Sequence, residues 1–289
     1  MLLGIPFREQ VSMKTKTSFK IGGAAALLLL PRDAEELSAC VRLCRDAGEA
    51  PLILGRGSNL LVKDTGLRQP VVSTEELKVL NERSPGRLFC QAGVKLQDLC
   101  LFAQKQGLTG LEFAYGIPGS AGGAAYMNAG AYGGEMKDVL RSVWAVSPEG
   151  IIRERPTEEL DLSYRHSVFM EDGSAVLAME MQLRPGDAAE IRARMDGIME
   201  RRKSKQPLEC PSAGSVFRRP PGQFAGALID QCGLKGCAVG GAQVSEKHAG
   251  FIVNAGGATA ADVRALIALV QTVVEEKTGF FLEPEIEFV

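Results

Sequence analysis

A segment of nineteen residues, GIPGSAGGAAYMNAGAYGG at positions 116–134, contains seven glycines, and most of its other residues are small. Such a backbone can be approached closely, because glycine has no Cβ and tolerates positive φ. Its main-chain N–H groups can converge on an oxygen-rich ligand, and a helix predicted to begin near Ser120 adds the positive end of its dipole. The segment therefore predicts a pyrophosphate cradle. Close packing of a helix without any ligand is the alternative.

A second glycine turn, GRGSN at 55–59, follows the apolar run PLIL at 51–54. Apolar residues resume at Leu60, Leu61 and Val62, so the pattern predicts a strand, a turn and a strand. The turn is only superficially similar to the dinucleotide fingerprint GxGxxG, because Leu60 occupies its sixth position and no helix follows. Two glycine loops on separate α+β units would instead grip an extended dinucleotide such as FAD from both sides.

Apolar periodicity predicts an alternation of strands and helices along the whole chain. A strand over 24–30 precedes a helix that begins at Asp33, with Glu36 in its first turn, and that Gly48 can end. Further strands are predicted over 88–94, 139–155 with SPEG as a turn, 174–183, 250–254 and 280–289. Further helices are predicted over 96–107, 187–205, 224–232 and from Thr259, where Asp262 completes a capping box. We expect an α+β chain with three parts, at 1–72, 73–190 and 191–289.

Composition limits the partners and the compartment of the chain. Thirty-three Lys and Arg residues oppose thirty-five Asp and Glu residues, so the formal net charge is −2 and we expect no nucleic-acid or membrane partner. The apolar run 24–30 is too short to cross a bilayer, and MLLGIPFREQ lacks an export signal, which predicts the cytoplasm. The seven cysteines include no CxxC pair and the two histidines have no metal-binding spacing, so we expect buried thiols and no metal.

Six motifs follow one another from end to end: TSFKIGG, LGRGSNLLVKD, GIPGSAGGAAYMNAGAYG, SYRHSVF, SAGSVFRRP and LEPEIEFV. Together they resemble the UDP-N-acetylenolpyruvoylglucosamine reductase (MurB) family, in its shorter-chain branch. The resemblance implies a two-subdomain FAD-binding fold of the vanillyl-alcohol-oxidase (PCMH-type) class and a C-terminal α+β substrate-binding domain. It also implies NADPH and non-covalent FAD, since neither glycine loop contains histidine or cysteine, and UDP-N-acetylglucosamine enolpyruvate as the small-molecule substrate.

The family's reaction passes hydride from NADPH to FAD and then to the enolpyruvyl group, giving UDP-N-acetylmuramate for peptidoglycan. Negative charge builds on the adjacent carbon and its carboxylate, so the site needs a cation and a proton donor. The resemblance implies that Ser215 donates the proton, Arg165 holds the carboxylate and Glu285 assists the transient enol. Strand alternation would place Glu283, Glu285 and Glu287 on one face, where repulsion should keep at least one of them protonated or paired.

The resemblance further implies two sets of binding residues. The cofactor set lies in the two glycine segments and comprises Gly55, Arg56, Gly57, Ser58, Asn59, Leu60, Gly116, Ile117, Pro118, Gly119, Ser120, Gly122, Gly123, Asn128, Gly130, Ala131 and Tyr132. The substrate set comprises Tyr164, Lys205, Arg218, Arg219, Gln243 and His248. Arg218 and Arg219 depart from the Lys-Asn pair of many relatives, so their role as diphosphate ligands competes with that of an exposed basic cluster.

Two other functions share part of this pattern. Another flavin oxidoreductase of the same fold, acting on a small sugar or alcohol, would keep both glycine loops but lack the set Arg165, Ser215 and Glu285. A non-catalytic nucleotide-binding protein would keep the fold without the chemistry. The sequence leaves open the oligomeric state and the preference between NADPH and NADH.

Overall fold

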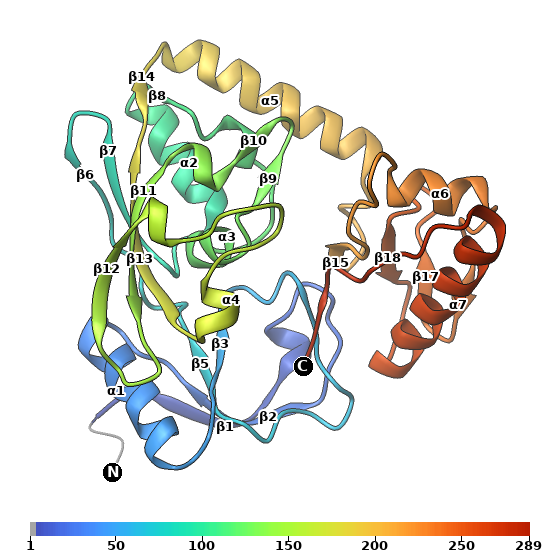
Figure 1. Cartoon of the computed structure of the whole chain (residues 1–289), viewed down its shortest axis with the longest axis horizontal. Coiled ribbons are helices and arrows are strands. Elements are labelled where there is room, and N and C mark those ends of the chain that lie inside the picture. The colour runs from blue at the N-terminus through green and yellow to red at the C-terminus, as the bar shows by residue number, and fades with distance from the viewer. Residues whose placement is uncertain (1–3) are drawn as a thin grey trace. The chain divides into compact units, whose positions relative to one another are not determined.

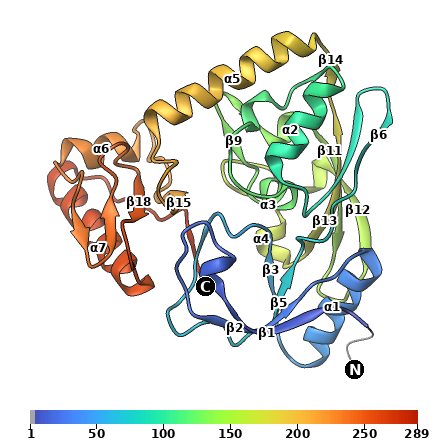
Figure 2. The same cartoon turned by 180° about the vertical axis from the view of Figure 1, so that it is seen from behind.

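A computed structural model describes residues 4–289, which form two compact units (Figures 1 and 2). Unit 1 comprises the described residues up to Glu9 together with Leu27–Arg56 and Gln69–Arg201. Unit 2 comprises Gln10–Ala26, Gly57–Arg68 and Arg202–Val289. Two N-terminal segments therefore belong to the same unit as the C-terminal third of the chain. The three-part boundaries expected from the sequence stay a prediction.

The first sheet has the strand order β1-β2-β5-β3, where β1 is Phe7–Ser12, β2 Ala24–Leu29, β3 Leu52–Leu54 and β5 Val71–Ser73. β5 lies between β2 and β3 and is parallel to both, and helix α1, Ala34–Asp46, makes the crossover. The Asp33 side chain accepts from the Glu36 N–H at 2.9 Å, which confirms the predicted helix start. The apolar face of α1 packs into a cluster with Leu29 and Val72 of the sheet.

The second sheet of unit 1 is antiparallel, with the order β12-β11-β13-β7-β6. Its strands are β6 Leu80–Ser84, β7 Arg87–Gln91, β11 Leu140–Val146, β12 Ile152–Pro156 and β13 Ala175–Gln182. Helices α2 (Leu96–Lys105) and α3 (Ala121–Tyr126) lie on one face of it (Figures 1 and 2). A Cβ on Gly122 would lie 2.6 Å from that of Ala92, so α3 can approach the end of β7 only because position 122 is glycine.

Short elements complete unit 1. They are β8 Leu108–Thr109, η2 Glu112–Ala114, β9 Gly130–Ala131, β10 Gly134–Glu135, η3 Met136–Asp138, η4 Thr157–Glu159, α4 Phe169–Asp172 and β14 Arg184–Pro185. η2 precedes the glycine-rich segment, β9 lies within it, and η4 and α4 flank the chain that carries Arg165.

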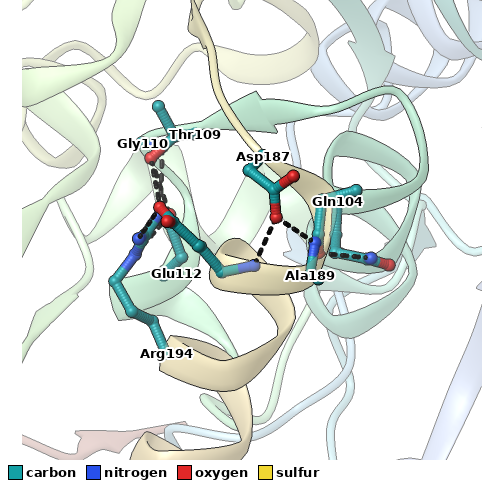
Figure 3. A network of polar contacts seen from close by, with 9 residues as sticks. Gln104, Thr109, Gly110, Glu112, Asp187, Ala189 and Arg194 are labelled. Carbon is teal, nitrogen blue, oxygen red and sulfur yellow. Dashed lines mark hydrogen bonds and ion pairs between the residues drawn. The ribbon is translucent and has the colours of Figure 1, made fainter.

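Helix α5, Ala188–Lys205, is anchored by a polar network at its first half (Figure 3). Asp187 Oδ1 accepts from the N–H groups of Ala189 and Glu190, both at 2.9 Å, and so caps the helix. Glu112 accepts from Thr109 Oγ1 at 2.6 Å, from the Gly110 N–H at 2.7 Å and from Arg194 Nη2 at 2.7 Å. The network therefore fixes α5 to the chain that leads into the glycine-rich segment.

Replacing Glu112 by Gln should lower the free energy of unfolding by about 1–2 kcal/mol at neutral pH, since the hydrogen bonds of an ionised group are lost. Burial alone would raise the pKa of Glu112, but hydrogen bonds from Thr109, Arg194 and Gly110 outweigh it and hold the pKa below its ordinary value. A depressed folded-state pKa means that the carboxylate stabilises the fold above the unfolded-state pKa and that this contribution is lost as pH falls through the folded-state pKa.

Urea unfolding from neutral pH down to about pH 3.5 checks this expectation, because the deficit of Glu112→Gln should shrink at the acidic end. The control is Glu158→Gln, a change at an exposed carboxylate in the same unit, which should show no deficit. A Glu112→Gln deficit of constant size across the range would contradict the assigned carboxylate role.

Unit 2 contains an antiparallel sheet with the order β15-β18-β17-β16. Its strands are β15 Ser212–Ser215, β16 Ala238–Val239, β17 Ala242–Val244 and β18 Phe251–Asn254. Its helices are α6 Ala225–Gln231 and α7 Ala260–Thr278, with the short η1 Met13–Thr15. Strands β4 (Leu60–Leu61) and β19 (Glu287–Phe288) form a parallel pair.

The start of α7 confirms the predicted capping box, in which Thr259 and Asp262 each accept from the other's N–H. The loop after β4 adds a second cap, because the Asp64 carboxylate accepts from the N–H groups of Ala260 and Ala261 at 2.8 and 3.0 Å. An acidic side chain at this end of a helix is favoured by the helix dipole. The chain that follows the first glycine turn is thereby fixed to α7.

The predicted strand over 280–289 is wrong for most of its length. Only Glu287 and Phe288 form a strand, and an isolated bridge joins Pro284 to Phe217. The partner of this segment is the chain at 216–218 up to Glu285 and the chain at 59–61 from Glu287 onward, so no single ladder runs along it. The Glu285 N–H donates to Val216 O at 2.7 Å, whereas the Glu287 N–H donates to Asn59 O at 2.8 Å.

Several strands were absent from the sequence expectation, among them β1 and β6, and two cysteines are less buried than expected. β1 and β6 are largely exposed and polar, so they lack the apolar alternation that marks a strand. All seven cysteines are free thiols, but Cys210 and Cys237 are only half-buried. Among residues 4–289, no helix combines the length and the apolar character required to span a bilayer.

Candidate functional site

The two glycine segments meet in unit 1 at Gly55 and Ser120. A Cβ on Gly55 would lie only 2.5 Å from Ser120 Oγ, so any side chain there would push the segments apart. Ser120 is the N-cap of α3, and its Oγ accepts from the Gly123 N–H at 3.2 Å. The local fold thus brings the start of the 55–59 turn against the start of the helix in the 116–134 segment.

The 55–59 turn offers main-chain donors that the protein itself does not use. Within residues 4–289, the N–H groups of Arg56, Gly57 and Ser58 make no hydrogen bond. Gly57 is buried and has φ of +58°, and a Cβ on it would lie 2.4 Å from Lys16 O. Buried N–H groups without partners are rare in proteins, and successive ones in a turn form an anion-binding concavity. The donor set fits the pyrophosphate of a dinucleotide.

In the 116–134 segment the donors lie before α3 rather than in its first turn. The N–H groups of Ala121 and Gly122 donate to Val94 O and Ala92 O at 2.8 and 2.9 Å. The N–H of Gly123 donates to Ser120 Oγ. By contrast, the N–H groups of Gly116 and Gly119 have no hydrogen-bond partner in the described chain. The expected contribution of the helix N-terminus is therefore limited to its dipole.

Asn128, another residue of the expected cofactor set, is occupied by protein contacts. Its side chain is buried, and its Nδ2 donates to Glu135 Oε2 at 2.8 Å and to Ser163 O at 2.9 Å. Its Oδ1 accepts from the Lys137 N–H at 2.9 Å. The amide thus ties the end of the glycine-rich segment to the turn that carries Arg165.

The remaining members of the cofactor set differ in exposure. Pro118, Gly123 and Tyr132 are exposed, whereas Leu60 and Gly122 are buried. Gly130 and Ala131 form β9, which pairs with β10, and the Arg201 guanidinium lies 4.8 Å from the centre of the Tyr132 ring. Gly116, Ile117, Gly119, Asn59 and Ser58 are half-buried.

Arg165 stands in unit 1 on a tight turn beside the glycine-rich segment. Its φ is +55°, and its Nη2 donates to Gly130 O at 3.1 Å. Tyr164 lies under it, with the guanidinium 5.2 Å from the ring centre. Ser167 Oγ donates to Tyr126 O at 2.6 Å. The structure therefore brings Arg165 and Tyr164 to one end of the expected cofactor segment.

Ser215 stands in unit 2 at the end of a β-bulge. β15 pairs with β18 at Ser212 opposite Val253 and at Ser215 opposite Phe251, so three steps along β15 match two along β18. Gly214, with φ of +80°, lies within the irregular stretch. Bulges of this kind turn a side chain out of the regular alternation. The Ser215 side chain is exposed as a result.

Gly214→Ala should therefore act through the backbone and not through packing. No atom lies within 4 Å of a Cβ at position 214, so packing is not disturbed. The free energy of unfolding should fall by about 1–2 kcal/mol, because alanine is strained at positive φ. The control is Gly197→Ala in the exposed interior of α5, where a Cβ also meets nothing; this change should stabilise the protein by about 0.5–1 kcal/mol. Urea unfolding of both variants checks the pair, and destabilisation by both would contradict the backbone argument.

Glu285 lies beside the chain of Ser215 in the same unit. The Glu285 N–H donates to Val216 O at 2.7 Å, and the Arg218 N–H donates to Glu283 O at 2.8 Å. Asn59, at the end of the first glycine turn, donates from Nδ2 to Glu285 O at 3.1 Å. Unit 2 therefore contains two of the three expected catalytic residues, and Asn59 of the expected cofactor loop is bonded to the main chain of one of them.

Of the three glutamates expected on one strand face, Glu283 is exposed while Glu285 and Glu287 are half-buried. Burial raises the pKa of Glu287 above its ordinary value. The cause is desolvation of the carboxylate, and not the repulsion between like charges that the spacing suggested.

The expected substrate residues of unit 2 are distributed around β15 and β17. Arg218, Arg219 and Lys205 are exposed, and the Arg219 guanidinium lies 4.5 Å from the ring centre of Phe224. Gln243 Nε2 donates to Gly236 O at 3.2 Å. His248 is half-buried, and its Nδ1 accepts from the Gly250 N–H at 3.1 Å. Burial lowers the pKa of His248, which favours a neutral ring with its proton on Nε2.

Sequence reasoning missed a polar group around His166. Asp161, His166 and Glu171 place their donor and acceptor atoms within 4.8 Å of one another. The signal was present as a carboxylate five residues before and five residues after the histidine, a spacing that matches no metal motif. Tertiary structure brings Asp161 to 3.7 Å from Nδ1 and Glu171 to 3.1 Å from Nε2 of the ring.

Family models match most of the chain. Residues 25–154 match the FAD binding domain, and residues 206–289 match the UDP-N-acetylenolpyruvoylglucosamine reductase C-terminal domain. A solvent-stable cholesterol oxidase shares the fold of part of the chain, with a TM-score of 0.51, 17% identity and coverage of 63% of this chain and 38% of that one. These likenesses, with the observed mixture of helices and sheets, confirm the predicted α+β fold class.

The family assignment rests on relatives that match nearly the whole chain. UDP-N-acetylenolpyruvoylglucosamine reductase of Syntrophomonas wolfei is 48% identical, over 96% of this chain and 93% of its own. That of Enterococcus faecalis is 47% identical, over 96% of this chain and 92% of its own. The crystal structure of the Thermus caldophilus reductase has a TM-score of 0.83 and 36% identity, covering 98% of each chain. The chain belongs to the UDP-N-acetylenolpyruvoylglucosamine reductase family.

Proposed function

We propose that this protein reduces UDP-N-acetylglucosamine enolpyruvate to UDP-N-acetylmuramate in peptidoglycan precursor synthesis, with NADPH as reductant, FAD as non-covalent carrier and the cytoplasm as compartment. Relatives that are 48% identical over 96% of the chain bear the name of this reductase. The observation that carries the proposal is the arrangement in unit 2, where Ser215 projects from a bulge beside Glu285. A simple sugar oxidase has no need of a proton donor paired with a carboxylate at this place.

The donor set of the glycine turns supports FAD as the cofactor. Arg56, Gly57 and Ser58 present main-chain N–H groups that the described protein leaves without acceptors, and Gly116 and Gly119 present two more. Phosphate oxygens are suitable acceptors for such groups. FAD, when bound, supplies a two-electron carrier that takes hydride from NADPH and delivers it to the substrate.

Each of the three polar side chains has a distinct task in the second half of the reaction. Arg165 holds the substrate carboxylate, on which negative charge grows as hydride arrives at the terminal vinyl carbon, the one that does not carry the carboxylate. Ser215 gives its hydroxyl proton to the other vinyl carbon, so that one hydride and one proton are added across the double bond. Glu285, whose main chain is fixed to Val216 and Asn59, assists the enol form of the substrate.

The exposed cations near Ser215 suit the other end of the substrate. Arg218 and Arg219 follow Ser215 by three and four residues, and Lys205 ends α5. We assign them to the UDP diphosphate, because guanidinium and ammonium groups pair with phosphate oxygens. Gln243, His248 and Tyr164 are assigned to neutral parts of the same ligand.

An anaerobic two-step titration tests the proposal. The purified protein should show flavin absorbance that bleaches when NADPH is added. Subsequent addition of UDP-N-acetylglucosamine enolpyruvate should restore the absorbance with a stoichiometry of one substrate per flavin, because each substrate takes up one hydride. Bleaching by NADPH without recovery of absorbance on addition of the sugar would contradict the assigned substrate. Purified protein that contains no flavin would contradict FAD as the cofactor.

A further inference from the structure

Arg165 occupies a turn that is unfavourable without support. The Ser163 N–H donates to His166 O at 3.3 Å, and the His166 N–H donates to Ser163 O at 3.2 Å, so Tyr164 and Arg165 form a two-residue loop. At φ of +55° the Cβ of Arg165 crowds its own backbone, a conformation that residues other than glycine, asparagine and aspartate seldom adopt. Contacts around the turn must therefore hold it in place.

The imidazole of His166 makes two such contacts, one at each ring nitrogen. Nδ1 lies 3.0 Å from the main-chain O of Asp161, and Nε2 lies 3.1 Å from Oε1 of Glu171 in α4. A carbonyl and a carboxylate can only accept, so both nitrogens must carry protons for the two bonds to exist together. Neutral imidazole has one N–H and can make only one of them. The arrangement therefore selects the imidazolium.

Electrostatics agree with this protonation. The Asp161 carboxylate lies 3.7 Å from Nδ1 and adds a negative charge on that side, while Glu171 provides one on the other. The hydrogen bond to Asp161 O, with help from Glu171 and against slight desolvation, holds the pKa of His166 above its ordinary value. Asp161 and Glu171 are the charged groups that face the ring, and the adjacent Arg165 side chain is directed to Gly130 O.

A cation site is the competing interpretation of the same three residues. Their ligand atoms lie within 4.8 Å of one another, but the carboxylates flank different ring nitrogens. A metal ion needs an unprotonated imidazole nitrogen as its ligand, whereas each ring nitrogen here lies within hydrogen-bond distance of an acceptor, at 3.0 Å from Asp161 O and 3.1 Å from Glu171 Oε1. The hydrogen-bonded imidazolium accounts for both carboxylates.

We propose that His166 is a positioning residue for Arg165, in which the doubly hydrogen-bonded imidazolium holds the Ser163–His166 turn and thereby the cation that binds the substrate carboxylate. This inference rests on the proposed function. Two further supports of the turn, Asn128 to Ser163 O and Ser167 to Tyr126 O, use groups that do not titrate near neutral pH. The His166 contacts are fully present below the unfolded-state pKa and one of them is lost as pH rises through the raised folded-state pKa.

The protonation claim is tested by NMR, independently of any enzymatic activity. The chain has only two histidines, so the two imidazole Cε1–H resonances are assigned by comparison with His166→Gln. His166 should titrate above the ordinary histidine pKa and His248 below it. Glu171→Gln keeps an acceptor but removes a charge, so it should lower the His166 pKa and leave that of His248 in place. A His166 pKa at or below the ordinary value would overturn the inference.

The positioning claim is tested by the KM for UDP-N-acetylglucosamine enolpyruvate as a function of pH. In the unmodified protein KM should rise about three- to tenfold through the His166 pKa, the factor that corresponds to one ordinary hydrogen bond. His166→Gln should have the higher KM at every pH, and His166→Arg, which keeps a permanent cation with several donors, should keep the lower KM throughout. Flavin reduction by NADPH should be the same in all three proteins.

These measurements distinguish failure of the positioning role of His166 from failure of the proposed function. If His166→Gln retains the KM and pH profile of the unmodified protein while all variants turn over the substrate, the positioning role is overturned and the proposed function stands. If no variant, nor the unmodified protein, reoxidises with the enolpyruvyl sugar, the proposed function fails and the role assigned to Arg165 fails with it.

Discussion

Ser215→Ala should slow reoxidation of the flavin by the enolpyruvyl sugar by about 10²–10⁴-fold, the contribution typical of a general acid, and leave reduction by NADPH nearly unchanged. The substitution removes a hydroxyl from an exposed position at the end of β15, so neither folding nor the cofactor turns should be disturbed. Stopped-flow measurement of the two half-reactions under anaerobic conditions separates these effects. Proton donation enters only the second of them.

Two further variants sharpen this test. Ser215→Cys keeps a dissociable proton at the same place, so its rate of flavin reoxidation should lie between those of Ser215→Ala and the unmodified protein. Ser12→Ala removes another exposed hydroxyl from unit 2, one that makes no helix-cap hydrogen bond, and should change neither half-reaction. If Ser215→Ala slowed both half-reactions equally, the serine would be acting through the fold and not as a proton donor.

Arg165→Ala should lower kcat/KM for the enolpyruvyl sugar by about 10- to 150-fold, because hydrogen bonds to a charged group contribute roughly 1.5–3 kcal/mol. Arg165→Lys keeps the charge but not the planar fork of donors, so its loss should be smaller. Substrate affinity is measured from the change in flavin absorbance on binding, and kcat/KM from steady-state turnover. The rate of flavin reduction by NADPH should not change.

The conformation of the turn requires a control of its own. Arg165→Asn removes the cation but tolerates positive φ, so it should reproduce the kinetic loss of Arg165→Ala while the turn stays intact. Arg184→Ala, at an exposed arginine of β14 in the same unit, should leave both half-reactions unchanged. Wild-type affinity for the enolpyruvyl sugar in Arg165→Asn would contradict the carboxylate-binding role.

The glycine pattern predicted the places where main-chain groups come close together, but not which of these groups stay available. Ser120 begins α3 as expected, yet the first N–H groups of that helix donate to Val94 and Ala92. The N–H groups that have no acceptor in the described chain lie instead at Gly116 and Gly119 and in the 55–59 turn. Hydrogen-bond allocation depends on which strand ends meet the helix, and glycine spacing carries no information about that.

The sequence by itself determined the elements whose signals lie within a few residues of one another. Asp33 with Glu36 fixed the start of α1, and Thr259 with Asp262 fixed the start of α7, since a helix cap is a contact across three positions. The collinear motifs likewise determined the family, because their order and spacing are properties of the chain alone.

Only the tertiary structure decided how distant segments combine. Asn59 binds the main chain of Glu285 across 226 positions, and residues 10–26 and 57–68 belong to unit 2 although the chain on either side of each segment belongs to unit 1. It also decided that the C-terminal segment changes its partner between Glu285 and Glu287, that burial raises the pKa of Glu287, and that two carboxylates converge on His166. Such pairings depend on the packing of whole elements against one another, and a local pattern of residues does not record which partner an element will meet.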